Sequence, residues 1–265
     1  MTVRAPIAGL VEGEHVLPAE TSHYLCRVRR LEPGDRFVAF DPAARTEAEA
    51  TIVLASPSAA RARIEVVRAA DVVAASDIVL VYALAKGDKV DDVVRDATEL
   101  GATRIIVTRT ERAVVKAPAD RVREKLDRWR RIAEQAARQC GRADPPSIDG
   151  VLDWPDALER ASDCDMRFCL DPRADLALGT ALLRSVERGT SLAFAIGPEG
   201  GLSPAEIATA RARGFLPASL GRFVLRTETV AAAVLGAVRI LSGGDDDDSN
   251  GDDDSNGDDD SNGDA

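Results

Sequence analysis

The sequence is poor in the residues that bind metals or form disulfides. Its 265 residues include two histidines and four cysteines, and no two cysteines form a Cys-x-x-Cys pair. We expect no structural zinc site, because such sites need four closely spaced thiolate or imidazole ligands. The four cysteines, at positions 26, 140, 164 and 169, are expected to be reduced thiols that are buried or idle.

Long apolar segments are also lacking. No uninterrupted apolar run is long enough to span a bilayer, and residues 1–6 lack the apolar core of a signal peptide. A cytoplasmic location is therefore expected. Three catalytic signatures are missing as well: the phosphate loop ending in Gly-Lys-Ser/Thr, the dinucleotide pattern G-x-G-x-x-G and the nucleophile elbow G-x-S-x-G. The last absence weakens a hydrolase interpretation.

The acidity of the chain is confined to its C-terminal end. Eleven aspartates and no basic residue lie in 245–265, a number equal to the formal net charge of −11, so the rest of the chain is neutral. Residues 244–265 repeat Asp-Asp-Asp-Ser-Asn-Gly and are expected to be disordered, because they contain almost no apolar residue. Each repeat matches half of a calcium loop but lacks the glutamate at the twelfth position, so no metal site is predicted.

The order of apolar runs predicts two domains. Short strand-like stretches at 36–40, 48–54 and 62–67, separated by Pro/Gly turns, predict a small β-barrel over residues 1–70, followed by a linker at 71–77. Strands at 78–84, 104–108, 166–170 and 192–196 then alternate with helices. The helices are expected at 89–100, 122–140 and 227–241. This alternation predicts a mainly parallel sheet covered by helices over 78–243.

Two glycine-containing segments carry the chemistry. In the first, an apolar strand leads into Gly197-Pro198-Glu199-Gly200-Gly201, and a helix begins at once, with Ser203 as its expected N-cap and Glu206 completing a capping box. Glycines let the backbone approach a ligand closely. A simple tight turn is the competing interpretation. In the second segment, residues 220–230, Arg226 stands before a helix, where a cation is unfavourable unless it awaits an anion.

Together the two segments, residues 196–201 and 220–230, resemble the signature loops of the SPOUT-class ribosomal RNA methyltransferases, specifically the 16S rRNA uracil-N3 methyltransferases (RsmE type). Further similarities lie at 97–102, 110–116 and 129–142, and residues 23–25 and 31–35 resemble the PUA-like RNA-binding domain of that family. The resemblance implies a trefoil-knotted α/β domain behind a PUA-like domain. It also implies S-adenosyl-L-methionine as cofactor, a homodimer, and 16S rRNA or the small ribosomal subunit as partner.

By the same resemblance, eleven residues are expected to line the cofactor site: Leu170, Ile196, Gly197, Pro198, Glu199, Gly200, Gly201, Leu220, Gly221, Leu225 and Thr227. Uracil N3 carries a proton and is a poor nucleophile until that proton leaves. Glu228 is the candidate proton acceptor and Arg226 the candidate stabiliser of the resulting anion. For Glu228, a role in favouring the helix dipole is an equally good interpretation.

A basic stretch is the candidate RNA-binding surface. Residues 104–142 contain twelve basic and five acidic residues, and three arginines cluster beside His23. The expected RNA contacts are His23, Arg27, Arg29, Arg30, Arg112, Arg128, Arg131, Arg138 and Arg142. The competing interpretation is an ordinary solvated face.

Two other functions remain open at this point. The chain could methylate another RNA position, such as a ribose 2′-oxygen, which mapping of the modified nucleoside would reveal. It could also be a non-catalytic RNA-binding or ribosome-assembly protein, which would bind RNA but not S-adenosylhomocysteine.

Overall fold

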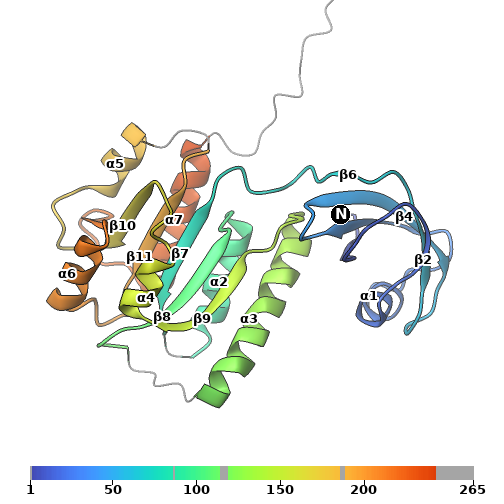
Figure 1. The fold of residues 1–265 in the computed structure, drawn as a ribbon, viewed down its shortest axis with the longest axis horizontal. Helices are drawn as coiled ribbons and strands as arrows, with labels where there is room; N and C mark the ends of the chain where they lie inside the picture. Colours follow the sequence, from blue (N-terminus) through green and yellow to red (C-terminus); the bar gives the residue numbers. More distant parts are fainter. Residues whose placement is uncertain (1, 86, 114–118, 186–188, 243–265) are drawn as a thin grey trace, which may run out of the picture.

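The computed structural model describes residues 2–85, 87–113, 119–185 and 189–242. The chain forms a β-rich N-terminal domain and a C-terminal α/β domain, which lie beside each other (Figure 1). The acidic repeats predicted to be disordered, together with residues 114–116 of the family resemblance, lie outside the described residues. None of the described helices has the length and apolar character needed to cross a membrane.

The N-terminal domain is built on a curved sheet. Its elements are β1 (Arg4–Pro6), β2 (Gly13–Val16), helix α1 (Ala19–His23), the π-helical turn η1 (Tyr24–Val28), β3 (Arg36–Asp41), β4 (Thr46–Leu54), β5 (Arg61–Ile64) and β6 (Arg68–Ala69). The strand order is β1-β3-β4-β5-β2, and β6 pairs with β4. The three predicted strands correspond to β3, β4 and β5. Within the described residues the end strands β1 and β2 are not paired with each other, so the predicted barrel is not closed by a hydrogen-bonded ladder.

Alternation along the strands forms the core of this domain. Ala48, Ala50 and Ile52 of β4 point to the same side and are buried, as alternating residues of a half-covered strand should be. Phe37 of β3 and Leu25 of η1 join the same apolar cluster. The turn η1 therefore packs against the curved sheet through Leu25, while Arg27 on its other side is exposed.

The C-terminal domain contains a parallel sheet of six strands. They are β7 (Ile78–Ala83), β8 (Arg104–Arg109), β9 (Ser147–Asp153), β10 (Met166–Leu170), β11 (Leu192–Ile196) and β12 (Leu216–Ala218). The order is β12-β10-β11-β7-β8-β9, and every neighbouring pair is parallel. The helices are α2 (Lys89–Glu99), α3 (Ala119–Cys140), α4 (Trp154–Glu159), α5 (Leu178–Ser185), α6 (Pro204–Ala212) and α7 (Thr227–Leu241).

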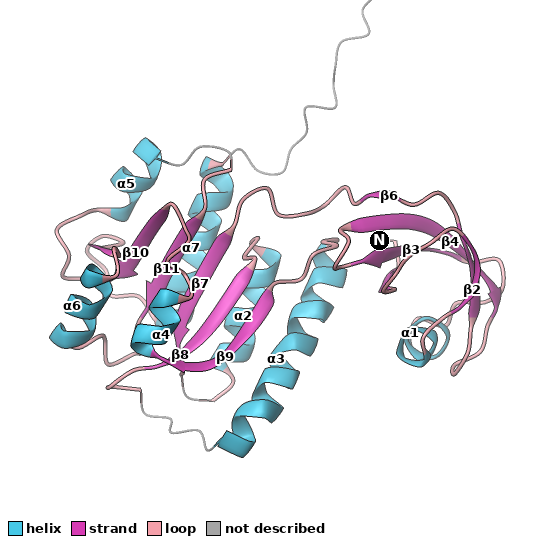
Figure 2. Ribbon diagram, viewed as in Figure 1, coloured by secondary structure: helices cyan, strands magenta, loops and turns pink. Residues whose placement is uncertain are grey.

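Helices cover both faces of this sheet (Figure 2). The central strand β7 is buried along its whole length, as the continuous apolar run at its position predicts. Leu80 and Tyr82 pack in one apolar cluster with residues of α2, α3, α5 and α7, whereas Val79 and Val81 pack in a second cluster with residues of α4 and α6. The predicted α/β class with a parallel sheet is confirmed. The strand order does not define how the chain is threaded, so the knot stays a prediction.

The junction between the domains corrects one expected RNA contact. Arg142 is buried, and its guanidinium donates to the carbonyl oxygens of Thr98 (2.8 Å), Ala102 (2.9 Å) and Asp144 (2.8 Å). Its Nε donates to the Asp144 carboxylate, which also accepts from the amide of Ala74 in the linker. Because a buried arginine with these partners cannot reach a phosphate, the prediction that Arg142 binds RNA is wrong. The residue holds the end of α3 to α2 and the linker.

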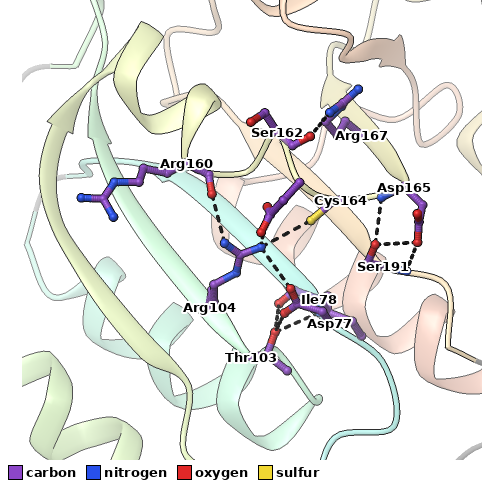
Figure 3. Close-up of polar contacts among 11 residues, drawn as sticks. Asp77, Ile78, Thr103, Arg104, Arg160, Ser162, Cys164, Asp165, Arg167 and Ser191 are labelled. Atoms are coloured by element: carbon purple, nitrogen blue, oxygen red, sulfur yellow. Dashed lines mark hydrogen bonds and ion pairs between the residues drawn. The ribbon is translucent and has the colours of Figure 1, made fainter.

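A second polar network closes the amino-terminal edge of the parallel sheet (Figure 3). The Arg104 guanidinium, on β8, contacts the carboxylates of Asp77 (3.0 Å) and Asp163 (2.8 Å) and donates to the Arg160 carbonyl. It also lies 3.7 Å from the sulfur of Cys164, and burial raises the pKa of that thiol to about 11. Burial likewise raises the pKa of Cys169 to about 12. Both thiols stay protonated at neutral pH, which suits them to packing rather than to nucleophilic chemistry.

Candidate active site

A pocket of about 510 Å³ opens at the carboxyl ends of β10, β11 and β12. This is the edge of a parallel α/β sheet where ligands usually bind. It lies opposite the edge that holds the Arg104 network, because Arg104 is the first residue of β8. One wall is the loop 197–203, which follows β11. Another is the loop 219–226, which follows β12 and leads into α7. The two glycine-containing segments singled out in the sequence thus meet in one cavity.

The pocket contains every residue that the resemblance assigns to the cofactor. They are Leu170, Ile196, Gly197, Pro198, Glu199, Gly200, Gly201, Leu220, Gly221, Leu225 and Thr227. Arg226 and Arg112 line it as well, whereas Glu228 does not. Lining residues that the sequence did not reveal are Asp171, Pro172, Arg173, Leu202, Ala218, Phe223, Val224 and Val230. Leu202 and residues 171–173 directly follow a predicted segment or strand, and three others lie within the segment 220–230, so these positions were the available signal.

Two glycines of the first loop are closely packed. A Cβ at Gly197 would lie 2.7 Å from Cγ of Leu202, and one at Gly200 would lie 3.3 Å from Cβ of Arg112. Gly201 adopts φ of +70°, a backbone conformation that glycine reaches without strain. The loop is therefore a tight turn, as the competing interpretation holds, but a turn in which Gly197 and Gly200 pack closely against neighbouring residues and which faces a cavity.

The capping box predicted at the start of α6 is present, and it also connects α6 to the loop after β8. Oγ of Ser203 accepts from the amide of Glu206 (3.3 Å), and the Glu206 carboxylate accepts from the amide of Ser203 (2.8 Å). The other oxygen of Glu206 accepts from the amide of Glu111 (2.7 Å). Next to it, the Arg112 guanidinium donates to the Gly200 carbonyl (3.1 Å). The loop after β8 is thereby fixed against the glycine loop.

The second loop places a cation at the pocket. Arg226 is the N-cap of α7, has an exposed side chain and forms no ion pair with any described residue. Thr227 behind it is buried, and its hydroxyl accepts a hydrogen bond from the Tyr82 hydroxyl (2.8 Å). Burial raises the pKa of Tyr82 to about 12, so this donor stays neutral. The start of α7 is held firmly while the guanidinium stays free to bind an anion.

Glu228 sits in a different environment from the one a proton acceptor needs. Its carboxylate accepts from the Thr227 hydroxyl (3.2 Å) and lies 3.4 Å from Nζ of Lys89. A hydrogen bond from its own amide and the charge of Lys89 lower its pKa, so it is a weak base. Lys89 also contacts Glu199 (2.8 Å) and was not expected to belong to the site. Nothing in the sequence connects this lysine with loops more than a hundred residues away.

Seven of the expected RNA contacts lie at η1 and on α3, whereas Arg112 lies in the loop after β8, is exposed and lines the pocket. His23, Arg27, Arg29 and Arg30 are exposed around η1, and Arg131 is exposed on α3. Arg138 of α3 stacks over the ring of Tyr24 at 4.8 Å, so the end of α3 lies against η1. Arg128 is exposed but paired with Asp91 and Asp88 of the α2 region.

Family models match both domains. The description "RNA methyltransferase domain" fits residues 73–239, and "RNA methyltransferase PUA domain" fits residues 17–65. The chain belongs to this RNA methyltransferase family. The match confirms the PUA-like identity of the N-terminal domain.

Relatives within the family have similar lengths. A Mycobacterium tuberculosis protein named ribosomal RNA small subunit methyltransferase E is 32% identical over 239 residues, which cover 86% of each chain. A Synechocystis protein of the same name is 31% identical over 88% of this chain and 75% of its own.

Two solved structures, each with its methyl donor bound, superpose on most of the chain. A methyltransferase from Legionella pneumophila, solved with its bound cofactor SAM, is 28% identical, with a TM-score of 0.82 over 91% of this chain and 98% of its own. A ribosomal RNA small subunit methyltransferase E from Neisseria gonorrhoeae, bound to S-adenosyl methionine, has a TM-score of 0.81 at 24% identity and shows the shared fold.

Proposed function

We propose that this RNA methyltransferase transfers the methyl group of S-adenosyl-L-methionine to N3 of a uridine in 16S rRNA of the small ribosomal subunit, in the cytoplasm. The observation that carries the proposal is the convergence of both glycine segments on one pocket, at the ligand-binding edge of the sheet. Family membership and the names of its relatives support the reaction and the substrate.

The pocket suits the proposed cofactor. Its volume of about 510 Å³ falls within the range of small-molecule sites. Leu170, Ile196 and Val230 offer apolar surface, and the crowded glycines at 197 and 200 bring bare backbone to the cavity wall. Such a wall can hydrogen-bond a purine and a polar amino-acid group without steric obstruction. When bound, S-adenosyl-L-methionine supplies an already activated methyl group.

The protein then has to position the uracil and make its N3 nucleophilic. We assign Arg226 the role of stabilising the negative charge that develops on the ring when the N3 proton is lost to solvent water. Its guanidinium lines the pocket and is free of ion pairs within the described part of the chain. Glu228 is the less suitable group, because Lys89 already engages it and its pKa is lowered. We assign it to holding the first turn of α7.

RNA is expected to reach this pocket along α3 and η1. Reversing the charge of Arg27, Arg29 and Arg131 should weaken binding of a 16S rRNA fragment and flatten the dependence of log Kd on log salt, by about one unit of slope for each phosphate that is no longer neutralised. All three side chains are exposed. Reversal of Arg213, which is already paired with Glu159 and does not line the pocket, is the matched control. An unchanged salt slope in the triple variant would mean that these arginines contact no phosphate and only face solvent.

The homodimer implied by the family resemblance belongs to the proposal. Phe223 and Val224 expose 85% and 83% of their surface beside the pocket, and large apolar side chains this exposed often mark an interface. A second copy covering this loop would complete the site. Light scattering should then give the mass of a dimer, and Phe223→Asp should shift that mass toward the monomer.

The function is tested by nucleoside analysis. Small-subunit rRNA from cells lacking the gene should lack one N3-methyluridine, and purified protein with S-adenosyl-L-methionine should restore it to that RNA. Methylation of a ribose or of another base would refute the proposed position. The absence of any transfer, together with the absence of heat on titration with S-adenosylhomocysteine, would leave a non-catalytic RNA-binding protein.

A further inference from the structure

Lys89 is the residue whose position the proposed chemistry does not explain. It is the first residue of α2, where the helix dipole disfavours a cation. Its ammonium instead lies between two carboxylates, that of Glu199 in the glycine loop at 2.8 Å and that of Glu228 in the first turn of α7 at 3.4 Å. The positive charge of Lys89 is thus unfavourable for α2 itself, and the carboxylates that stabilise it lie outside that helix.

The two carboxylates need a cation between them. Both reach the same nitrogen, so they are close neighbours, and like charges at such distances repel one another. Glu199 belongs to loop 197–203, while Glu228 lies in the first turn of α7. Without Lys89, repulsion would act directly between the segments that enclose the pocket. The Thr227 hydroxyl, which donates to Glu228 and accepts from the Tyr82 hydroxyl, carries no charge, and burial raises the pKa of Tyr82 to about 12, so that group is neutral as well.

We propose that Lys89 is a positioning residue for the methyl donor. By pairing with Glu199 and Glu228 at once, Lys89 joins the glycine loop to the start of α7. The inference rests on the proposed function, because it assumes that the pocket binds that donor. It assigns Glu199 to closing the pocket rather than to contact with the ligand alone. It also explains why the carboxylate of Glu228 is kept ionised and out of the pocket.

Calorimetry with S-adenosylhomocysteine tests this role. Lys89→Met should weaken binding by about fivefold, the size expected for partly exposed ion pairs. Lys89→Arg should retain affinity, since a guanidinium can also reach two carboxylates. The matched control is Arg95→Met on the same helix, whose partners Asp92 and Asp96 lie away from the pocket, and it should bind as the wild type does.

Two further measurements separate electrostatic joining from simple packing. In the Lys89→Met background, Glu228→Gln removes one of the facing charges and should recover most of the lost affinity. Lowering the pH from 8 to 5 should have the same effect in Lys89→Met, because mutual repulsion raises the carboxylate pKa and protonation relieves it. Recovery by neither route, or wild-type affinity in Lys89→Met, would overturn the inference while leaving the proposed function intact. Failure of the wild type itself to bind would overturn both.

Discussion

Replacing Gly197 by alanine is expected to weaken S-adenosylhomocysteine binding by about ten- to a hundredfold, the effect of overpacking a tight site. The new Cβ would lie 2.7 Å from Cγ of Leu202 and 3.3 Å from its backbone nitrogen. Leu202 is buried in the apolar cluster beneath α4 and α6, so it cannot turn away into solvent. The loop must move instead, and it moves within the pocket wall.

The same substitution elsewhere is the control. Gly179 lies in the first turn of α5, is exposed, and has no atom within 4 Å of the point that a Cβ would occupy. Gly179→Ala should therefore bind the ligand normally and unfold at the same or a slightly higher temperature, since alanine favours helix. Normal affinity in Gly197→Ala, measured by titration calorimetry, would mean that the glycine loop does not enclose the ligand.

The sequence predicted the elements whose apolar residues form a clear local pattern. Strands β10 and β11 and helix α7 have the predicted bounds, because each is an apolar run that ends at a turn or a polar helix entrance. Strand β9 escaped prediction because it is an edge strand, contains Gly150, and buries only Ile148 and Val151. Strand β12 has three residues, one of them Pro217, and pairs only with β10. Such strands form because pairing with the neighbouring strand stabilises them, and their own residues have little β-propensity.

The site divides in the same way. Residues that follow directly from a strand and a glycine turn could be read from the sequence, and all eleven assigned to the cofactor line one pocket. Lys89 could not be read, because its partners lie 110 and 139 positions away and no local pattern connects them. Arg142 was misjudged for a related reason. A count of basic residues cannot distinguish an exposed arginine from one buried against three carbonyl oxygens.

Replacing Arg226 by alanine is expected to lower kcat by about a hundred- to a thousandfold, the usual loss when one group that stabilises developing charge is removed. Affinity for S-adenosylhomocysteine should fall only a few-fold, because the glycine loops that enclose the ligand are unchanged. Arg222→Ala is the control, since Arg222 is an exposed arginine in the same loop that does not line the pocket.

The dependence on pH distinguishes charge stabilisation from simple placement of the RNA. If Arg226 stabilises the anion formed at uracil N3, its loss should matter less at alkaline pH, where more of the base has already lost its proton. The ratio of wild-type to Arg226→Ala turnover should then shrink as the pH rises, at saturating RNA. A ratio that stays constant would assign Arg226 to holding the RNA backbone. Undiminished turnover in Arg226→Ala would assign the stabilising charge to another arginine that lines the pocket. Arg173 is paired with Asp171, so Arg112, which donates to the Gly200 carbonyl, is the better candidate.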